Sequence, residues 1–294
     1  MRLGYVCVNL TLGRKQRTLR LATLQQKGMP YLQTLIDDNL ALLGDVLRWN
    51  AENGVEMFRY GADIIPFGSH ASVDLAEIDF SAAAALPTLA AGQRMSVHPG
   101  QFTVISAEGA VWDHCQRELS YQNYIMDTLG LDGDILIHGG GVYGDPVGTA
   151  RRIAAHIKEL PPAVHRRLCL ENDERSWSVL DLLPLCEETG VKLIVDVLHH
   201  RLNGGGEGGV PFDKLPWGRI GATWTASGRL PKLHYSEQDP AKQPGAHGAY
   251  VDAASFRRFQ QGIALREYDV MLECKAKDLA LQRLREELAS CASY

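Results

Sequence analysis

The chain has no apolar stretch that could cross a membrane. None of its hydrophobic runs reaches the roughly 18 residues that a spanning helix requires. Residues Met1 to Leu12 also lack the order of positive charge, apolar core and small cleavage site that marks a signal peptide. We therefore expect a protein without membrane association that is located in the cytoplasm.

Cysteine is scarce and scattered. The six cysteines form no CxxC pair and no other zinc-binding spacing, so the sequence gives no sign of a thiolate metal site. Cys7, Cys169 and Cys274 fall in apolar runs, where a free thiol behaves as a small hydrophobic group. We expect buried, reduced thiols for these three and for the remaining cysteines, Cys115, Cys186 and Cys291.

The chain also lacks the excess of positive charge that is typical of proteins that bind nucleic acids, because its net charge is −5. One segment differs from the rest: between Gly13 and Gly28 there is no acid, and the basic residues are Arg14, Lys15, Arg17, Arg20 and Lys27. A local basic face can contact phosphates while the whole protein stays acidic. A solvated loop is the simpler interpretation of this segment taken alone.

No low-complexity segment and no linker rich in proline or serine divides the 294 residues. A pattern repeats instead, in which a β-branched or aliphatic run is followed by a loop and an amphipathic stretch. This alternation predicts βαβ units and a parallel sheet. The apolar runs cover residues 3–9, 55–61, 93–98, 134–140, 167–172, 192–197, 231–236 and 268–274.

The stretches between these runs have apolar residues at helical spacing. Helices are predicted over residues 31–53, 112–130, 147–160, 178–190 and 276–289, whereas the glycine-rich residues 203–228 predict only a weak helix. Eight strand-and-helix units predict a closed (β/α)8 TIM barrel, formed as a single domain by residues 1–294.

The residues that end the predicted strands indicate where a site lies. In a (β/α)8 barrel all strands have their carboxyl ends at one mouth, and catalytic residues come from several of them. Most of these terminal residues are histidines or carboxylates, which a barrel without a site would have little reason to place there. In chain order they are Asn9, Tyr60, His98, His138, Glu171, Asp196, His234 and Glu273.

Together these side chains predict a metal cluster. Imidazole and carboxylate ligands without thiolate suit Zn²⁺ or Mn²⁺, and Mn²⁺ is favoured as oxygen ligands increase. Three carboxylates at one mouth would repel each other unless cations lay between them. His199 and His247 are further candidates, and either His199 or its neighbour His200 can face the metals. Any one of these residues alone would more often be structural, as we expect for His114, His156 and His165 on predicted helices.

Lys232 precedes His234 by two residues on the same predicted strand, so both side chains point to the same side of it. An ammonium beside divalent cations would be repelled. The lysine must therefore turn away, lose its proton, or become a carbamate, which is an anionic ligand. A contact to solvent or to phosphate is the alternative that remains open.

Seven motifs now suggest a family. They stand in one order from Leu3 to about Asp278 and resemble those of the UV damage endonuclease family, which is similar in fold and metal site to endonuclease IV. The motifs are LGYVCVN, HPGQF, LEND, DVLHH, PKLHYS, GAHGAY and MLECKAKD.

The resemblance implies a site with three divalent metal ions, expected to be Mn²⁺, with Zn²⁺ or Mg²⁺ as alternatives. Glu171 would bridge two of the ions, and Lys232, as a lysine or in carboxylated form, would lie near the third; both are expected to be catalytic. The implied ligands are His98, His138 and Glu171 for the first ion; Glu171, Asp196, His234 and Glu273 for the second; His199 and His247 for the third; and His70 as a further histidine.

On the DNA side, the resemblance implies that Gln101 and Phe102 probe the duplex at the lesion. The family pair is Gln-Tyr, so stacking survives the change to Phe but a hydroxyl contact does not. Tyr5 and Asn9 would line the pocket for the damaged nucleotides. The implied activity is a metal-dependent nick immediately 5′ of a UV photoproduct, with abasic sites as a second class of lesion, by a monomer acting on double-stranded DNA.

Two other functions fit parts of this pattern. A barrel sugar isomerase or epimerase would use the same strand-end ligands around a small closed pocket. A damage sensor would bind a lesion without cutting, but it would not need metals and carboxylates to recognise a kink. The basic segment and the HPGQF loop favour DNA over a small sugar.

Overall fold

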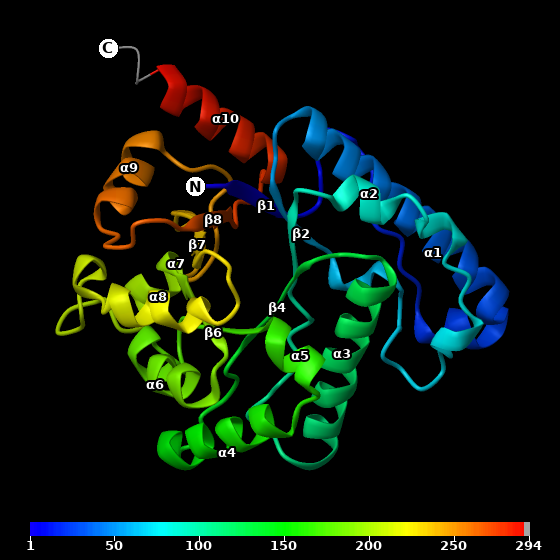
Figure 1. The fold of residues 1–294 in the computed structure, drawn as a ribbon, viewed down its shortest axis with the longest axis horizontal. Helices are drawn as coiled ribbons and strands as arrows, with labels where there is room; N and C mark the ends of the chain where they lie inside the picture. Colours follow the sequence, from blue (N-terminus) through cyan, green and yellow to red (C-terminus); the bar gives the residue numbers. More distant parts are fainter. Residues whose placement is uncertain (291–294) are drawn as a thin grey trace.

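The strands close into a parallel barrel in which each pairs with the next and β8 pairs back on β1 (Figure 1). The structure is a computed structural model that describes residues 1–290. It confirms the predicted (β/α)8 barrel, and every predicted strand is present. The strands are β1 Leu3–Cys7, β2 Met57–Tyr60, β3 Arg94–Val97, β4 Gly133–His138, β5 Leu168–Glu171, β6 Lys192–Asp196, β7 Lys232–Tyr235 and β8 Asp269–Leu272.

Helices follow the strands and surround the barrel. The longest, α1, begins ten residues earlier than expected, at Leu21, and bends where Gly28 adopts a φ of 69° two residues before Pro30. The weak helix expected over residues 203–228 is reduced to the short α8. The helices are α1 Leu21–Glu52, α2 Leu86–Ala90, α3 Gly109–Thr128, α4 Pro146–Glu159, α5 Pro162–Arg167, α6 Val179–Thr189, α7 Val197–Leu202, α8 Trp217–Thr225, α9 Ala253–Gln261 and α10 Lys277–Ser290.

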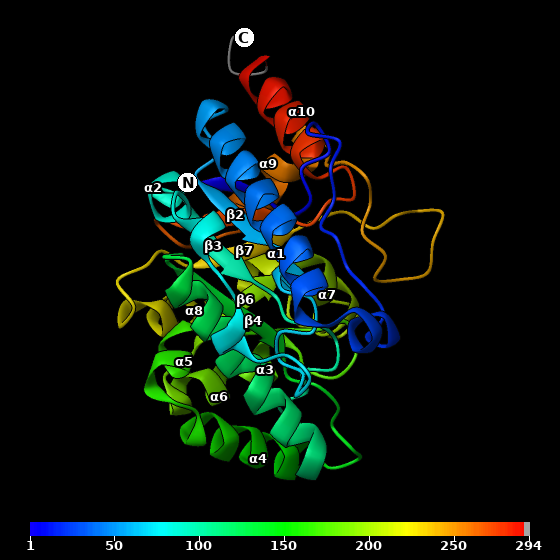
Figure 2. The same cartoon turned by 90° about the vertical axis from the view of Figure 1, so that its right-hand side faces the viewer.

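The main hydrophobic core lies between the strands and this helical layer. Helix α10 lies near the carboxyl-terminal end of α1 (Figures 1 and 2), where Arg285 of α10 donates to the carbonyls of Asn53 and Gly54. No helix among the described residues is long and apolar enough to span a bilayer.

Four cysteines are buried and free as predicted (Cys115, Cys169, Cys186 and Cys274), but Cys7 is exposed, and Cys291 lies outside the described residues.

The inside of the barrel is layered because alternate residues of each strand point inward. On β4, for example, Asp134, Leu136 and His138 rise in turn from the amino-terminal floor to the carboxyl-terminal mouth. Small apolar clusters separate the charged floor from the mouth; their strand residues are Val6, Met57 and Met271 in one, and Leu136, Cys169 and Ile194 in the other. Trp224 of α8 joins the second cluster and donates its indole N–H to the carbonyl of Leu193.

Asp134 is the centre of the charged floor. Its carboxylate is fully buried and lies 3.0 Å from the Lys232 ammonium, 3.2 Å from Arg94, 3.3 Å from Lys192 and 3.5 Å from Arg229. Burial by itself would raise the pKa of this carboxyl, but Lys232 and the other cations outweigh that effect and hold the pKa well below its usual value. Asp134 is therefore ionised and compensates several buried cations at once.

This placement corrects the expectation that Lys232 lies at the rim beside the metal ligands. Its side chain does point into the barrel, on the same side of β7 as His234, but its ammonium lies in the floor network on Asp134. Burial lowers the pKa of Lys232 to about 8 against the attraction of Asp134.

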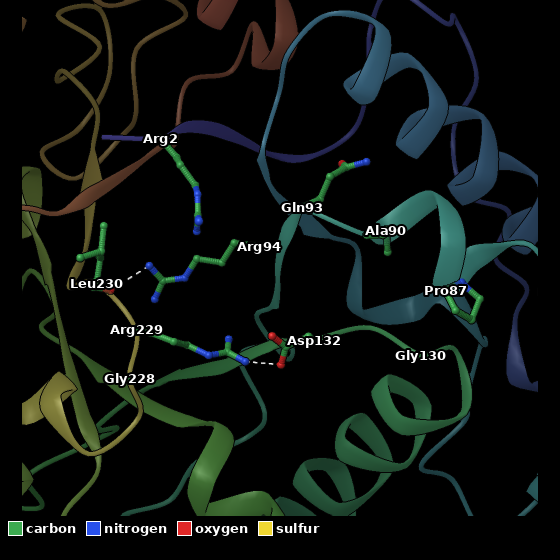
Figure 3. A pocket seen from close by; sticks show the side chains of 12 residues that line it. Arg2, Pro87, Ala90, Gln93, Arg94, Gly130, Asp132, Gly228, Arg229 and Leu230 are labelled. Carbon is green, nitrogen blue, oxygen red and sulfur yellow. Dashed lines mark hydrogen bonds and ion pairs between the residues drawn. The ribbon is translucent and has the colours of Figure 1, made fainter.

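A hollow of about 380 Å³ opens at the floor, at the end of the barrel away from the mouth (Figure 3). Arg2, Arg94 and Arg229 line it, and Arg229 pairs there with Asp132. Residues at the amino-terminal end of a TIM barrel generally serve stability rather than chemistry. We therefore attribute the floor charges to folding.

We predict that Asp134→Asn destabilises the fold by about 3–5 kcal/mol, because it leaves buried cations without their shared counter-charge. The free energy of unfolding, measured in denaturant, checks this. Asp132→Asn is the matched control, since the Asp132 side chain is 88% exposed and should contribute little. Equal stability of the two variants would contradict the role given to Asp134.

Candidate metal centre

Six strand-end side chains converge at the mouth of the barrel. They form two groups of ligand atoms, and within each group all atoms lie within 4.8 Å of one another. Glu171 belongs to both groups and so can bridge two ions. The first group is His98, His138 and Glu171, and the second is Glu171, Asp196, His234 and Glu273.

Local backbone contacts fix the orientation of these ligands. Nδ1 of His98 lies 2.9 Å from the Pro99 carbonyl oxygen, and Nδ1 of His138 lies 3.3 Å from that of Glu171, so Nε2 of each ring is left for a metal. Asp196 caps α7 by accepting a hydrogen bond from the His199 N–H with Oδ1, which holds its carboxylate at the mouth. The following turn thus orients His98 and Asp196, and the neighbouring strand β5 orients His138.

His234 lies between two carboxylates of the centre. Its Nδ1 lies 2.7 Å from Glu171 Oε1 and 3.0 Å from Glu273 Oε1. Burial would lower the pKa of this histidine, but Glu171 and Glu273 outweigh burial and raise the pKa to about 9. At His98, by contrast, burial and the nearby Arg59 lower the pKa to about 4, so this imidazole is neutral and able to bind a metal.

The centre has unsatisfied polar atoms that fit a cation. Glu171 Oε2, Asp196 Oδ2 and His234 Nε2 are buried and have no hydrogen-bond partner among the described residues. Burial also raises the pKa of Asp196, which shows how poorly its charge is compensated there. Leaving such atoms unpaired is costly, and divalent ions held by the imidazole and carboxylate ligands would satisfy them.

His199 and His247 adjoin this centre but belong to neither ligand group. Their ring centroids are 5.9 Å apart, and the His199 ring is 5.6 Å from that of His138. His247 Nε2 lies 3.7 Å from Glu273 Oε2. The alternative between His199 and His200 is decided for His199, because His200 turns away to the Val210 carbonyl.

The remaining histidines lie away from the cluster. His70 is exposed, and its Nδ1 accepts a hydrogen bond from the Ser72 N–H, so the structure does not bring it into either ligand group. His156 stacks on Trp112 and His165 bonds to the Thr189 carbonyl, as expected of structural residues.

Gln101 and Phe102 occupy the loop after His98, between β3 and α3. Both are exposed, and the Phe102 side chain is 71% exposed although it is a large apolar group. Beside them lies a hollow of about 390 Å³ that His70, His114 and Phe102 help to line. The pair is therefore free to contact a macromolecule at the mouth.

Tyr5 and Asn9, which were expected to line a pocket for the damaged nucleotides, are both buried. The structure does bring them together, since the Asn9 side-chain N–H donates to the Tyr5 hydroxyl, which in turn donates to Asn50 of α1. Tyr5 is fully buried because its ring points outward from the barrel, where it packs beside Phe58 and Trp49. This placement leaves no surface of Tyr5 for a nucleotide.

Sequence reasoning missed Arg59 as a residue of the site. It lies on β2, is buried, and its guanidinium is 2.5 Å from Glu273 Oε1. The signal was a lone arginine inside an apolar run, but Tyr60 was taken as the residue at the strand end. Tyr60 is buried, and its hydroxyl has no hydrogen-bond partner among the described residues.

The basic segment is partly neutralised. Arg14 pairs with Asp45, and Arg17 pairs with Asp38, both on α1. Residues 21–27 are helical and do not form the open loop that was the simplest expectation. Contact between this segment and DNA stays a prediction.

The fold and the mouth define a (β/α)8 barrel with a candidate metal centre, and sequence comparison gives its family. Residues 1–293 match the model of a family described as UV-endonuclease UvdE, and the chain belongs to that family. A putative UV-damage endonuclease of Acanthamoeba polyphaga mimivirus is 31% identical, over 97% of this chain and 90% of that protein. A UV-damage endonuclease of Schizosaccharomyces pombe is 33% identical, over 96% of this chain and 50% of that longer protein.

Solved structures agree. The crystal structure of SacUVDE superposes with a TM-score of 0.84 at 29% identity and covers both chains completely. Endonuclease IV from Thermus thermophilus has a TM-score of 0.60 at 17% identity, over 99% of this chain and 100% of that one. A D-psicose 3-epimerase from Clostridium cellulolyticum reaches 0.52 at 14% identity, over 93% and 85% of the two chains. The last two show a shared fold alone.

We predict that Mn²⁺ raises the thermal midpoint of the wild-type protein, because a ligand that binds only the folded state stabilises it. The gain is about 2.7 kcal/mol when free metal exceeds Kd roughly 100-fold. Glu171→Gln should lose most of this shift, since Glu171 belongs to both ligand groups. Glu188→Gln, on the surface of α6, serves as the control and should respond like wild type. An equal Mn²⁺ shift in the Glu171 variant would contradict the assignment.

Proposed function

We propose that this protein is a metal-dependent UV damage endonuclease. It hydrolyses the phosphodiester bond immediately 5′ of a UV photoproduct, and of an abasic site, in double-stranded DNA, and leaves a 3′ hydroxyl that starts excision repair. One observation carries the proposal: in a chain of the UvdE family, the strand ends form two ligand groups that share the buried Glu171. We further propose that it acts as a monomer in the cytoplasm.

The metal centre is proposed to hold three divalent ions, with Mn²⁺ preferred over Zn²⁺ or Mg²⁺ because its ligands mix imidazole with carboxylate oxygen. Two ions correspond to the two ligand groups that share Glu171, and His199 with His247 would hold the third. His70 is left out, because it is exposed and outside both groups. Bound there, the ions supply Lewis-acid catalysis for attack of water on phosphorus and for departure of the 3′ oxygen.

The chain itself contributes charge and position. Arg59, held against Glu273, puts a guanidinium at the mouth, where negative charge develops on the phosphate in the transition state. Glu171 keeps a depressed pKa because His234 outweighs its burial, so it is ionised over the working pH range and available as a ligand. The layer of apolar side chains below excludes water from the floor side of the site.

Lys232 is not assigned a catalytic contact in this proposal, because its ammonium is bound to Asp134 in the floor. A lysine with its pKa lowered to about 8 has a larger neutral fraction at neutral pH than an exposed lysine. The neutral amine is the form that combines with CO₂. Conversion of Lys232 to a carbamate stays a prediction.

Lesion recognition is proposed to use the exposed loop after His98. A crosslinked or abasic site is already poorly stacked, so extruding it costs less than extruding normal bases by up to a few kcal/mol. Phe102, with most of its ring exposed, can fill the gap left in the stack, and Gln101 can bond to the bases that remain.

The two rival functions fit less well. The epimerase structures share only a distant fold with this chain, at 14% identity for the example above. A damage sensor without catalysis would have no use for buried carboxylates that each keep one oxygen atom without a hydrogen-bond partner among the described residues. Nicking assays separate all three functions.

We predict that the protein nicks UV-irradiated supercoiled plasmid in Mn²⁺ but not in chelator, and leaves undamaged plasmid intact. Glu171→Gln and Asp196→Asn should each lower nicking by more than about 100-fold, because each removes a metal ligand. Circular dichroism should show both variants folded. Near-native nicking by either variant, at native metal content, would show that the mouth does not carry the chemistry.

We predict that the double variant Gln101→Ala, Phe102→Ala loses its preference for damaged over undamaged duplex while its metal content stays normal. The reason is that both side chains are exposed in the loop after His98 and belong to neither ligand group. Competition binding with the two duplexes measures the preference. If discrimination is unchanged, these residues do not probe the lesion.

A further inference from the structure

The loop between β4 and α4, residues 139–145, holds an exposed aromatic side chain in a strained conformation. Tyr143 has a φ of 50°, which non-glycine residues rarely adopt, and it is 61% exposed. The glycines at positions 140 and 144 also have positive φ values, of 80° and 76°. Strain of this kind persists only where the surroundings impose it, and it concentrates at functional sites.

The surroundings of Tyr143 do impose it. Trp177 donates its indole N–H to the Gly140 carbonyl, and the Val142 carbonyl accepts from the Asp145 N–H and the Thr149 hydroxyl. The loop is thus pinned on both sides of Tyr143, while the ring itself stays open to solvent. A tyrosine ring that is exposed to solvent contributes little to the stability of the fold, so its position indicates a partner outside the chain.

Arg152 connects this loop to the one that carries Phe102. Its guanidinium carbon lies 5.5 Å from the Tyr143 ring centroid, its Nε–H donates to the Ser106 carbonyl, and it pairs with Glu108 at 3.5 Å. Ser106 and Glu108 belong to the β3–α3 loop, a few residues after Phe102. Two loops with exposed aromatic rings are therefore tied together beside His98 and His138 of the metal centre.

We propose that Tyr143, backed by Arg152, forms a second base-stacking subsite on the DNA-binding face. Its ligand is an unstacked nucleobase of the duplex next to the lesion, and the inference rests on the proposed function. A nucleobase suits the subsite because an exposed aromatic ring beside a guanidinium offers stacking and a cation to the adjoining phosphate. Phe102 fills the lesion gap, and Tyr143 receives a neighbouring base.

The test measures binding without cleavage by the metal-loaded protein in Mn²⁺, on a duplex that contains a non-hydrolysable linkage 5′ of an abasic-site analogue and 2-aminopurine beside it. Tyr143→Ala should bind this duplex about tenfold more weakly than wild type, the loss expected for one base stack. Tyr143→Phe should bind within about twofold of wild type, because stacking needs the ring and not the hydroxyl. 2-Aminopurine emission should be quenched by wild type and by the Phe variant, but not by the Ala variant.

Tyr124→Ala is the matched control, since Tyr124 is 41% exposed but lies on α3, away from the strand-end loops. It should bind like wild type, and all variants should keep the wild-type thermal midpoint.

Wild-type affinity and quenching in Tyr143→Ala would overturn the subsite and leave the proposed function standing. Equal losses in the Ala and Phe variants would also overturn it, by assigning the effect to the hydroxyl. A wild-type protein that binds damaged and undamaged duplex equally would overturn both the subsite and the proposed function.

Discussion

Three carboxylates gathered at the mouth of one barrel are the constraint on which the rest of the structure depends. Glu171, Asp196 and Glu273 end strands β5, β6 and β8 or follow them directly, and Glu171 and Asp196 are fully buried. Arg59 compensates part of this charge through its ion pair with Glu273. One oxygen atom each of Glu171 and Asp196 still has no hydrogen-bond partner among the described residues, which divalent ions would provide.

The barrel keeps the ligands of the mouth apart from the charged network of the floor. Asp134 forms ion pairs with the cations of the floor, while the metal ligands lie at the mouth. An apolar layer separates the two ends. The charges of the floor are matched to one another inside the fold. Those of the mouth are left partly unmatched, as expected where a site has to bind ions and a phosphate from outside.

Much of the fold and of the ligand set could be predicted from the sequence, because apolar runs mark strands and the residue that ends a strand faces the mouth. The depth of a side chain inside the barrel, and the side of the strand on which it lies, were harder to predict. Two-residue spacing placed Lys232 on the same side of β7 as His234, but one pleat, roughly 7 Å, is enough to move its amine into the floor. Choosing Tyr60 instead of Arg59 as the strand-end residue of β2 reversed the facing, since neighbouring residues point to opposite sides. Alternation along β1 placed Tyr5 and Asn9 on one face, as their hydrogen bond confirms, but it did not indicate that Tyr5 is fully buried.

The central claim is that Glu171 holds divalent ions in the mouth of a DNA-cleaving barrel. Anomalous diffraction at the manganese edge, from crystals grown in Mn²⁺ at neutral pH or above, tests it most directly. The account predicts anomalous peaks within coordination distance of Glu171, with one toward His98 and His138 and another toward Asp196, His234 and Glu273. A map without a peak at Glu171, from protein that nicks irradiated DNA under the same conditions, would contradict it.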